Sequence, residues 1–117
     1  MTAVLADLRA TGGPLPFVDD EDWRNDPDYA SAMLGGHDGS GIGISVRLAD
    51  AESDRIASVA DQVQEWAIEE LRIRSATNWP PCPHRPDAHP LAAVNRNGVA
   101  RWACPSDSTA FAPIGSL

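Results

Sequence analysis

Residues 51–74 carry apolar side chains at three- and four-residue spacing, and this pattern constrains the fold more than any other part of the chain. Such spacing aligns the side chains in one stripe along a helix. Asp50 is a plausible N-cap, acids follow in the first turn where the helix dipole favours them, and prolines end the pattern. The stripe consists of Ile56, Val59, Ala60, Val63, Trp66, Ala67 and Leu71. We therefore expect one long helix over residues 51–74, with one face covered by other elements.

Strand patterns lie on both sides of this helix. GIGISVRL, residues 41–48, alternates apolar with small or polar residues, as a strand with one buried face does. LAAVN and VARWAC flank RNG, and Asn97-Gly98 is a favoured type I′ pair that predicts a hairpin. TAFAP, residues 109–113, can add a further strand to its edge. Earlier in the chain, AVLADLR predicts a short helix and residues 29–34 a helical turn.

The order strand, helix and three strands predicts a small α+β domain. With 117 residues the chain is long enough for one core but not for two. We expect the long helix to pack on a single, small and mostly antiparallel sheet. Hydrophobic residues make up 43% of the chain, so the core is modest and a metal or disulfide would add useful stability.

Two cysteines and two histidines lie at the two ends of the predicted hairpin. The segment NWPPCPHRPDAHP holds Cys82, His84 and His89 before the first strand, and Cys104 follows the second. Closing the hairpin brings its two ends together, and these side chains with them. Two thiolates and two imidazoles form a common tetrahedral zinc set, and a site with four protein ligands is structural. We therefore expect a structural zinc knuckle at one end of the hairpin.

The Cys-Pro pairs at 82–83 and 104–105 are similar to those of zinc-ribbon knuckles, so residues 79–112 resemble a zinc ribbon. The resemblance implies ligand-bearing turns that cap a hairpin. The chain departs from it in having Cys82-x-His84 where a Cys-x-x-Cys pair is usual, and one cysteine in the second knuckle. The wider pattern of WPPCP, HP, W.CP and IG.L also resembles a family of small proteins of actinobacterial type, which implies no particular function.

Several alternatives to this zinc set stay open. The cysteines can be plain core residues or form a disulfide, although a cytoplasmic Cys pair is usually reduced, metal-bound or catalytic. Asp107 stands three residues after Cys104, the spacing of a second knuckle ligand, and can replace a histidine. Trp79 and Trp102 precede the two cysteines and are expected to shield the metal from water.

Glu70 is a polar residue within the apolar stripe of the long helix. It can accept a hydrogen bond from a ligating histidine, His84 or His89, or pair with Arg74 one turn later on the helix. If one ligand position were open, Glu70 would be the general base of a small zinc-dependent hydrolase. The hydrolase is the alternative interpretation. A protein without catalysis is favoured, because the chain lacks the His-Glu-x-x-His and Pro-Cys-x-x-Cys motifs of known zinc enzymes.

The strongest charge cluster is DDEDWRNDPD, residues 19–28, whose six acids and one arginine give a formal charge of −5. A solvated loop is the simplest interpretation. As a docking segment it would attract a protein with a basic surface, through Asp19, Asp20, Glu21 and Asp22 and with Trp23 as an apolar anchor. Nucleic acid and anionic membranes are disfavoured as partners because the whole chain carries a net charge of −8.

These observations predict an acidic, loop-rich arm over residues 1–40 and an α+β zinc-knuckle domain over residues 41–117. Neither a signal peptide nor a membrane span is recognisable, so we expect a cytoplasmic protein. The function that follows is a small zinc-stabilised binding or adaptor module that engages a protein partner.

Overall fold

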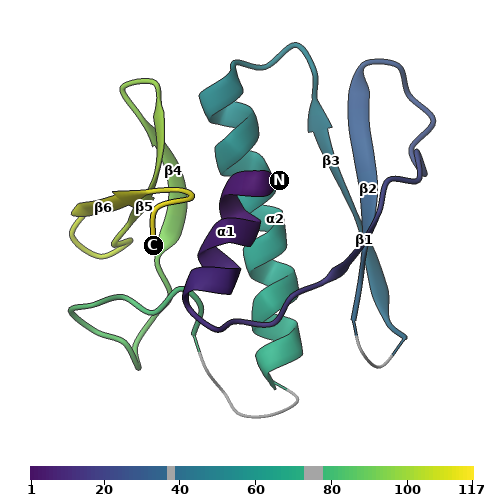
Figure 1. Cartoon of the computed structure of the whole chain (residues 1–117). Coiled ribbons are helices and arrows are strands. Elements are labelled where there is room, and N and C mark those ends of the chain that lie inside the picture. Colours follow the sequence, from purple (N-terminus) through teal and green to yellow (C-terminus); the bar gives the residue numbers. More distant parts are fainter. Residues whose placement is uncertain (37–38, 73–77) are drawn as a thin grey trace.

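The computed structural model describes residues 1–36, 39–72 and 78–117, which form two helices and six strands (Figure 1). In chain order these elements are α1 (Thr2–Ala10), β1 (Phe17–Asp19), β2 (Tyr29–Gly35), β3 (Gly41–Arg47), α2 (Glu52–Arg72), β4 (Ala92–Arg96), β5 (Val99–Ala103) and β6 (Ala110–Pro113). The α+β class is confirmed.

The strands form two antiparallel sheets, β1-β2-β3 and β4-β5-β6, where a single sheet was expected. Helix α2 lies between them and contacts β3 on one side and β4 and β5 on the other, with α1 packed against it (Figure 1). The prediction of a helical turn at residues 29–34 was wrong, since these residues belong to β2. All seven residues of β2 pair with β3, from Tyr29 opposite Arg47 to Gly35 opposite Gly41. Because β3 has this local partner, it does not join the C-terminal hairpin.

The long helix is confirmed. It begins at Glu52, with Glu52 and Asp54 as acids in the first turn, and residues 73 and 74 lie outside the described part of the chain. The expected stripe faces the core: Ala60, Val63, Trp66 and Ala67 are buried, and Ile56, Val59 and Leu71 pack against them.

The predicted hairpin is also confirmed. β4 and β5 pair in register, with Arg96 opposite Val99. Asn97 and Gly98 have φ angles of 54° and 80°, as a type I′ turn requires. Strand β6 adds to the β5 edge with a register shift between Arg101 and Ala103. The turn therefore brings the residues before β4 close to those after β5.

Residues 1–40 share a core with the rest of the chain. Helix α1, close to the short helix expected at residues 3–9, buries Val4 and Leu8. Leu34 of β2 is fully buried in the same cluster, which also contains Trp102 of β5. The core thus connects both sheets through the two helices.

A buried carboxylate joins α1 to the C-terminal part of the chain. Asp7 has no solvent exposure and accepts a hydrogen bond of 2.8 Å from the Trp102 indole N–H. The main-chain N–H groups of Gly115 and Leu117 donate to the same carboxylate at 2.7 and 2.8 Å. Three donors therefore offset the desolvation of this acid, as a buried polar group requires.

We predict that Asp7→Asn lowers the free energy of unfolding by about 3 kcal/mol, because one amide oxygen cannot satisfy three buried donors. Urea denaturation of the two proteins measures the difference. Asp61→Asn, at an exposed position of α2, is the matched control and should change stability little. Equal effects of the two substitutions would contradict the structural role of Asp7.

Candidate metal centre

The segment from Trp79 to Leu91 forms a loop whose two ends are held together. Leu91 N donates to Pro80 O at 2.8 Å, and Pro81 and Pro90 form an isolated antiparallel bridge. Gln64 of α2, which is buried, donates its amide to both Trp79 O and Leu91 O. One helix side chain thus fixes both ends of the loop that carries the predicted ligands.

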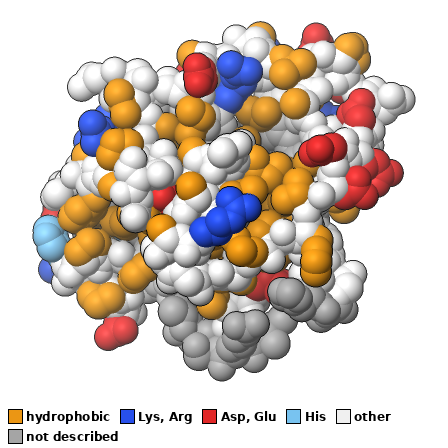
Figure 2. Space-filling view, in the orientation of Figure 1, with side chains coloured by type: hydrophobic (Ala, Val, Ile, Leu, Met, Phe, Trp, Pro, Cys, Tyr) orange, Lys and Arg blue, Asp and Glu red, His pale blue; other side chains and the backbone are white. Residues whose placement is uncertain are grey.

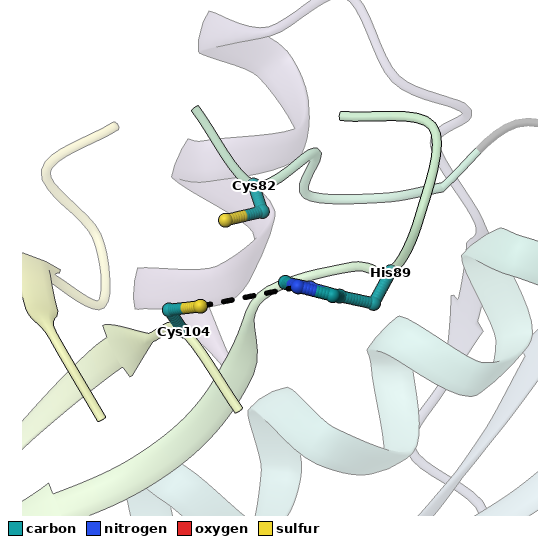
Figure 3. A group of neighbouring side chains, drawn as sticks. All are labelled: Cys82, His89 and Cys104. Atoms are coloured by element: carbon teal, nitrogen blue, oxygen red, sulfur yellow. Dashed lines mark hydrogen bonds between the residues drawn. The ribbon is translucent and has the colours of Figure 1, made fainter. Parts of the chain in front are cut away.

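Three of the four predicted ligands come together at this loop and the end of β5. Ligand atoms of Cys82, His89 and Cys104 all lie within 4.8 Å of one another, a group that could hold a metal ion. Figure 3 shows the Cys104 sulfur directed at the His89 ring, 3.9 Å from Nε2, and the Cys82 side chain above this pair. The Cys82 and Cys104 side chains are 0% and 2% exposed, and both thiols are free of a disulfide.

A tight turn sets the position of Cys104. Its N–H donates to Thr109 O at 2.8 Å and its carbonyl accepts from Ser108 N at 2.9 Å, which closes residues 104–109 between β5 and β6. On the other side of the group, His89 Nδ1 lies 3.3 Å from Pro90 O. A proton on Nδ1 would donate to this carbonyl and leave the Nε2 lone pair facing the thiols, which is the orientation of a metal ligand.

The surroundings of Cys82 favour the thiolate, the form that binds metal. Burial alone raises the pKa of this thiol. Hydrogen bonds from the backbone N–H groups of Arg85 and His84, together with one from the Cys104 side chain, outweigh burial, so the pKa of Cys82 is lowered. Both N–H groups come from the turn that follows Cys82, which Arg85 N closes by donating to Cys82 O at 3.1 Å.

His84, the fourth predicted ligand, lies outside the three-residue group, and so does Asp107. Its ring packs edge-on against Phe111 with a centroid distance of 5.4 Å. Its Nδ1 is 3.9 Å from Asp107 Oδ2, and both side chains are more than half exposed. Hydrogen bonds from Thr109, through both its backbone and its side chain, and from Cys104 lower the pKa of Asp107 to about 2.

Two tryptophans belong to the same buried core cluster as the two cysteines. Trp79 and Trp102 meet edge to face, with ring centroids 5.5 Å apart and planes at 82°. Both are buried, and the Trp79 indole N–H donates to Thr11 Oγ1 at 3.0 Å. Trp66 of α2 belongs to the same core cluster. The two cysteines and these tryptophans are thus buried in one apolar core.

Glu70 is directed toward the other half of the molecule. Its carboxylate lies against Gly36, just after β2, where a side chain at position 36 would overlap it. It also lines a pocket with Ser40, Gly41 and Ile42. These contacts are with the β2–β3 part of the chain, so the structure gives no support to Glu70 as a partner of the ligating histidines. Arg74, its other expected partner, lies outside the described residues.

The acidic segment folds over the outer face of the first sheet. The Trp23 indole N–H donates to Ala32 O and Ile44 O at 3.0 and 3.1 Å, and a Cβ at Gly43 would lie 2.7 Å from the ring. Asp22 accepts from Ser31 Oγ at 2.7 Å and from Asn25 N at 3.2 Å. Trp23 is thus engaged within the chain, although 42% of it is exposed.

The neighbouring acids remain at the surface. Asp19, Asp20 and Glu21 are exposed, and Asp19 Oδ1 accepts a hydrogen bond from Glu21 N at 3.1 Å. Figure 2 shows acidic side chains gathered on the side of the molecule where Figure 1 places this segment. The exposed acids and the exposed part of Trp23 are therefore both accessible in the predicted docking segment.

Comparisons with known proteins give no relative: no protein-family profile, no curated protein and no solved structure matches the chain. Among the described residues, no helix has both the length and the apolar character that crossing a membrane requires. The interpretation of the centre therefore depends on its own geometry.

Sequence reasoning missed one residue of the site, Gln64. It falls between Ala60 and Ala67 on the apolar stripe, where an amide has no apolar role. A polar residue in such a stripe signals a buried hydrogen-bond partner. The partners themselves are main-chain carbonyls of a distant loop, which no side-chain pattern reveals.

We predict that Gln64→Leu destabilises the protein by about 2 kcal/mol, because it leaves two buried carbonyls without a donor. Hydrogen–deuterium exchange should increase in the 78–91 loop. The matched control is Gln62→Leu, on the same helix, because Gln62 bonds the main chain of Ser45 in β3 instead. That variant should increase exchange in β3 and leave the loop unchanged. Equal loop protection in the two variants would contradict the role given to Gln64.

Proposed function

We propose that this chain is a small zinc-stabilised binding module that engages a protein partner and has no catalysis of its own. The observation that carries the proposal is the group of Cys82, His89 and Cys104, whose ligand atoms lie within 4.8 Å of one another. Two thiolates and an imidazole select zinc over the hard cations, which prefer oxygen ligands.

A structural role for the metal is supported by its surroundings. The two thiols are buried in the same core cluster as the tryptophan pair. The ligands come from a proline-rich loop and from a turn, which a metal would fasten to each other. A zinc-dependent hydrolase would need a general base at the centre, and Glu70, the residue proposed for that role, packs against Gly36 instead.

The energetic consequence would be a strong coupling between metal binding and folding. Ligands that are scattered in the unfolded chain bind metal weakly, so most of the binding free energy becomes folding free energy. In this chain the two thiol-bearing segments are separated by the whole β4–β5 hairpin. A metal would therefore stabilise the hairpin ends as well as the loop.

The partner would be a protein with a basic surface. Residues 19–28 carry a formal charge of −5, and Asp19, Asp20 and Glu21 are exposed. The negative electrostatic potential of this segment would speed its encounter with positively charged surfaces and repel nucleic acid. Trp23 is held against Gly43 and is 42% exposed, so the acids would supply recognition and the tryptophan a supporting apolar surface.

We predict one zinc per chain in the native mass of protein purified without added metal. A strong chelator should remove it and increase hydrogen exchange over residues 78–91 and 104–109. Cys82→Ser and Cys104→Ser should each lose the metal. Ser108→Ala, in the same turn but without a ligand side chain, is the matched control and should keep it. A native mass without metal in a folded protein would contradict the proposed function.

We predict that affinity capture isolates one protein with a basic surface, and that replacing the acids of residues 19–28 by their amides abolishes its binding. The control variant replaces three exposed acids of α2, Glu52, Asp61 and Glu65, by their amides and should retain it. Binding should also weaken as salt is raised. Retention of the partner by the first variant would show that the acidic segment is not the docking surface.

A further inference from the structure

Cys82, His89 and Cys104 supply three protein ligands, whereas a closed structural zinc site has four. Three side chains at the rim of the group are candidates for the remaining position: the Ser106 hydroxyl, the His84 imidazole and the Asp107 carboxylate. We propose that Asp107 is the fourth ligand and that His84 is its positioning partner. This inference rests on the proposed function and names the ligand set of the same centre.

The fold of the β5–β6 turn holds Asp107 beside Cys104. The turn is closed by the two main-chain hydrogen bonds between Cys104 and residues 108 and 109. Thr109 N donates to Asp107 Oδ1 at 2.9 Å, which orients the carboxylate, and its other oxygen, Oδ2, faces His84 Nδ1 at 3.9 Å. The same turn therefore carries both the ligand Cys104 and an oriented Asp107 carboxylate.

The spacing is that of a zinc knuckle. Asp107 stands three residues after Cys104, the separation of the two ligands in a Cys-x-x-Cys turn, with a carboxylate in place of the second thiolate. Carboxylate oxygen is an accepted zinc ligand, at about 2.0–2.2 Å from the metal. On binding, the metal would replace the two thiol protons, which are released to solvent, and each sulfur would bond zinc as a thiolate.

His84 is arranged to hold the carboxylate rather than to reach the metal. Its ring is seated edge-on against Phe111 of β6, and its Nδ1 faces Asp107 Oδ2 at 3.9 Å. A histidine that faces a ligating carboxylate orients that ligand. The Ser106 hydroxyl lies 3.1 Å from His89 Nε2 and is a neutral oxygen, which structural zinc sites do not use.

The test measures zinc affinity by competition with a chromophoric chelator, in full-length protein with Asp107→Asn, His84→Ala and the control Asp87→Asn. Asp87 is an exposed acid of the ligand loop, so its variant reports the loss of one negative charge alone. Asp107→Asn should weaken zinc binding by more than about 100-fold and His84→Ala by about 10-fold, while Asp87→Asn changes it little. The cobalt spectrum of Asp107→Asn should also change, and that of His84→Ala should keep its ligand-field bands.

The variant Asp107→Cys tests the inference through a gained spectroscopic signal, so the result does not depend on a loss of protein stability. The substitution restores a Cys-x-x-Cys turn, so its cobalt complex should gain the charge-transfer absorption of a third thiolate, whereas Asp87→Cys should gain none. Unchanged zinc affinity in Asp107→Asn, or a greater loss in His84→Ala than in Asp107→Asn, would overturn the inference and leave the metal centre standing. Absence of zinc from the wild-type protein would instead overturn the proposed function.

Discussion

The position of the ligand loop depends on the hydrogen bonds that the Gln64 side-chain amide donates. This amide donates to main-chain carbonyls at both ends of the loop, Trp79 O and Leu91 O, from a buried position on α2. Between these ends the loop has little regular structure, so the helix must determine where Cys82 and His89 lie. A buried amide with both hydrogens donated is stable in the core, whereas an unpaired one would not be. The central helix thus positions the loop that carries Cys82 and His89, two residues of the candidate metal centre.

The two halves of the molecule are organised around that helix in different ways. The first sheet packs its apolar face on α2 and carries the acidic segment on its outer face, where Trp23 lies on Gly43. The second sheet ends in the turn that presents Cys104, and Asp7 ties its Trp102 to α1. Charge and metal ligands therefore occupy opposite sides of α2. A partner bound to the acids would leave the centre untouched, which suits a metal whose role is structural.

Sequence patterns predicted the elements that depend on local chemistry. The stripe from Ile56 to Leu71 gave the long helix, and Asn97-Gly98 gave the hairpin that brings Cys104 beside His89. The division into two sheets was missed because strand pairing is a non-local choice: β2 reads as a helical turn until its pairing with β3 is seen. The position of His84 was missed for a similar reason, since its packing on Phe111 depends on how a proline-rich loop meets β6. Spacing identifies ligand types, but the loop path decides which of them meet.

The most direct test of the centre is X-ray absorption at the zinc edge of the purified protein. Two thiolates, one imidazole and one further light ligand predict two sulfur neighbours at about 2.3 Å and two nitrogen or oxygen neighbours at about 2.0–2.2 Å. That shell would establish that Cys82 and Cys104 bind the same ion. A shell of nitrogen and oxygen alone would contradict it, because it would place any bound zinc away from the thiols and leave both cysteines as ordinary core residues.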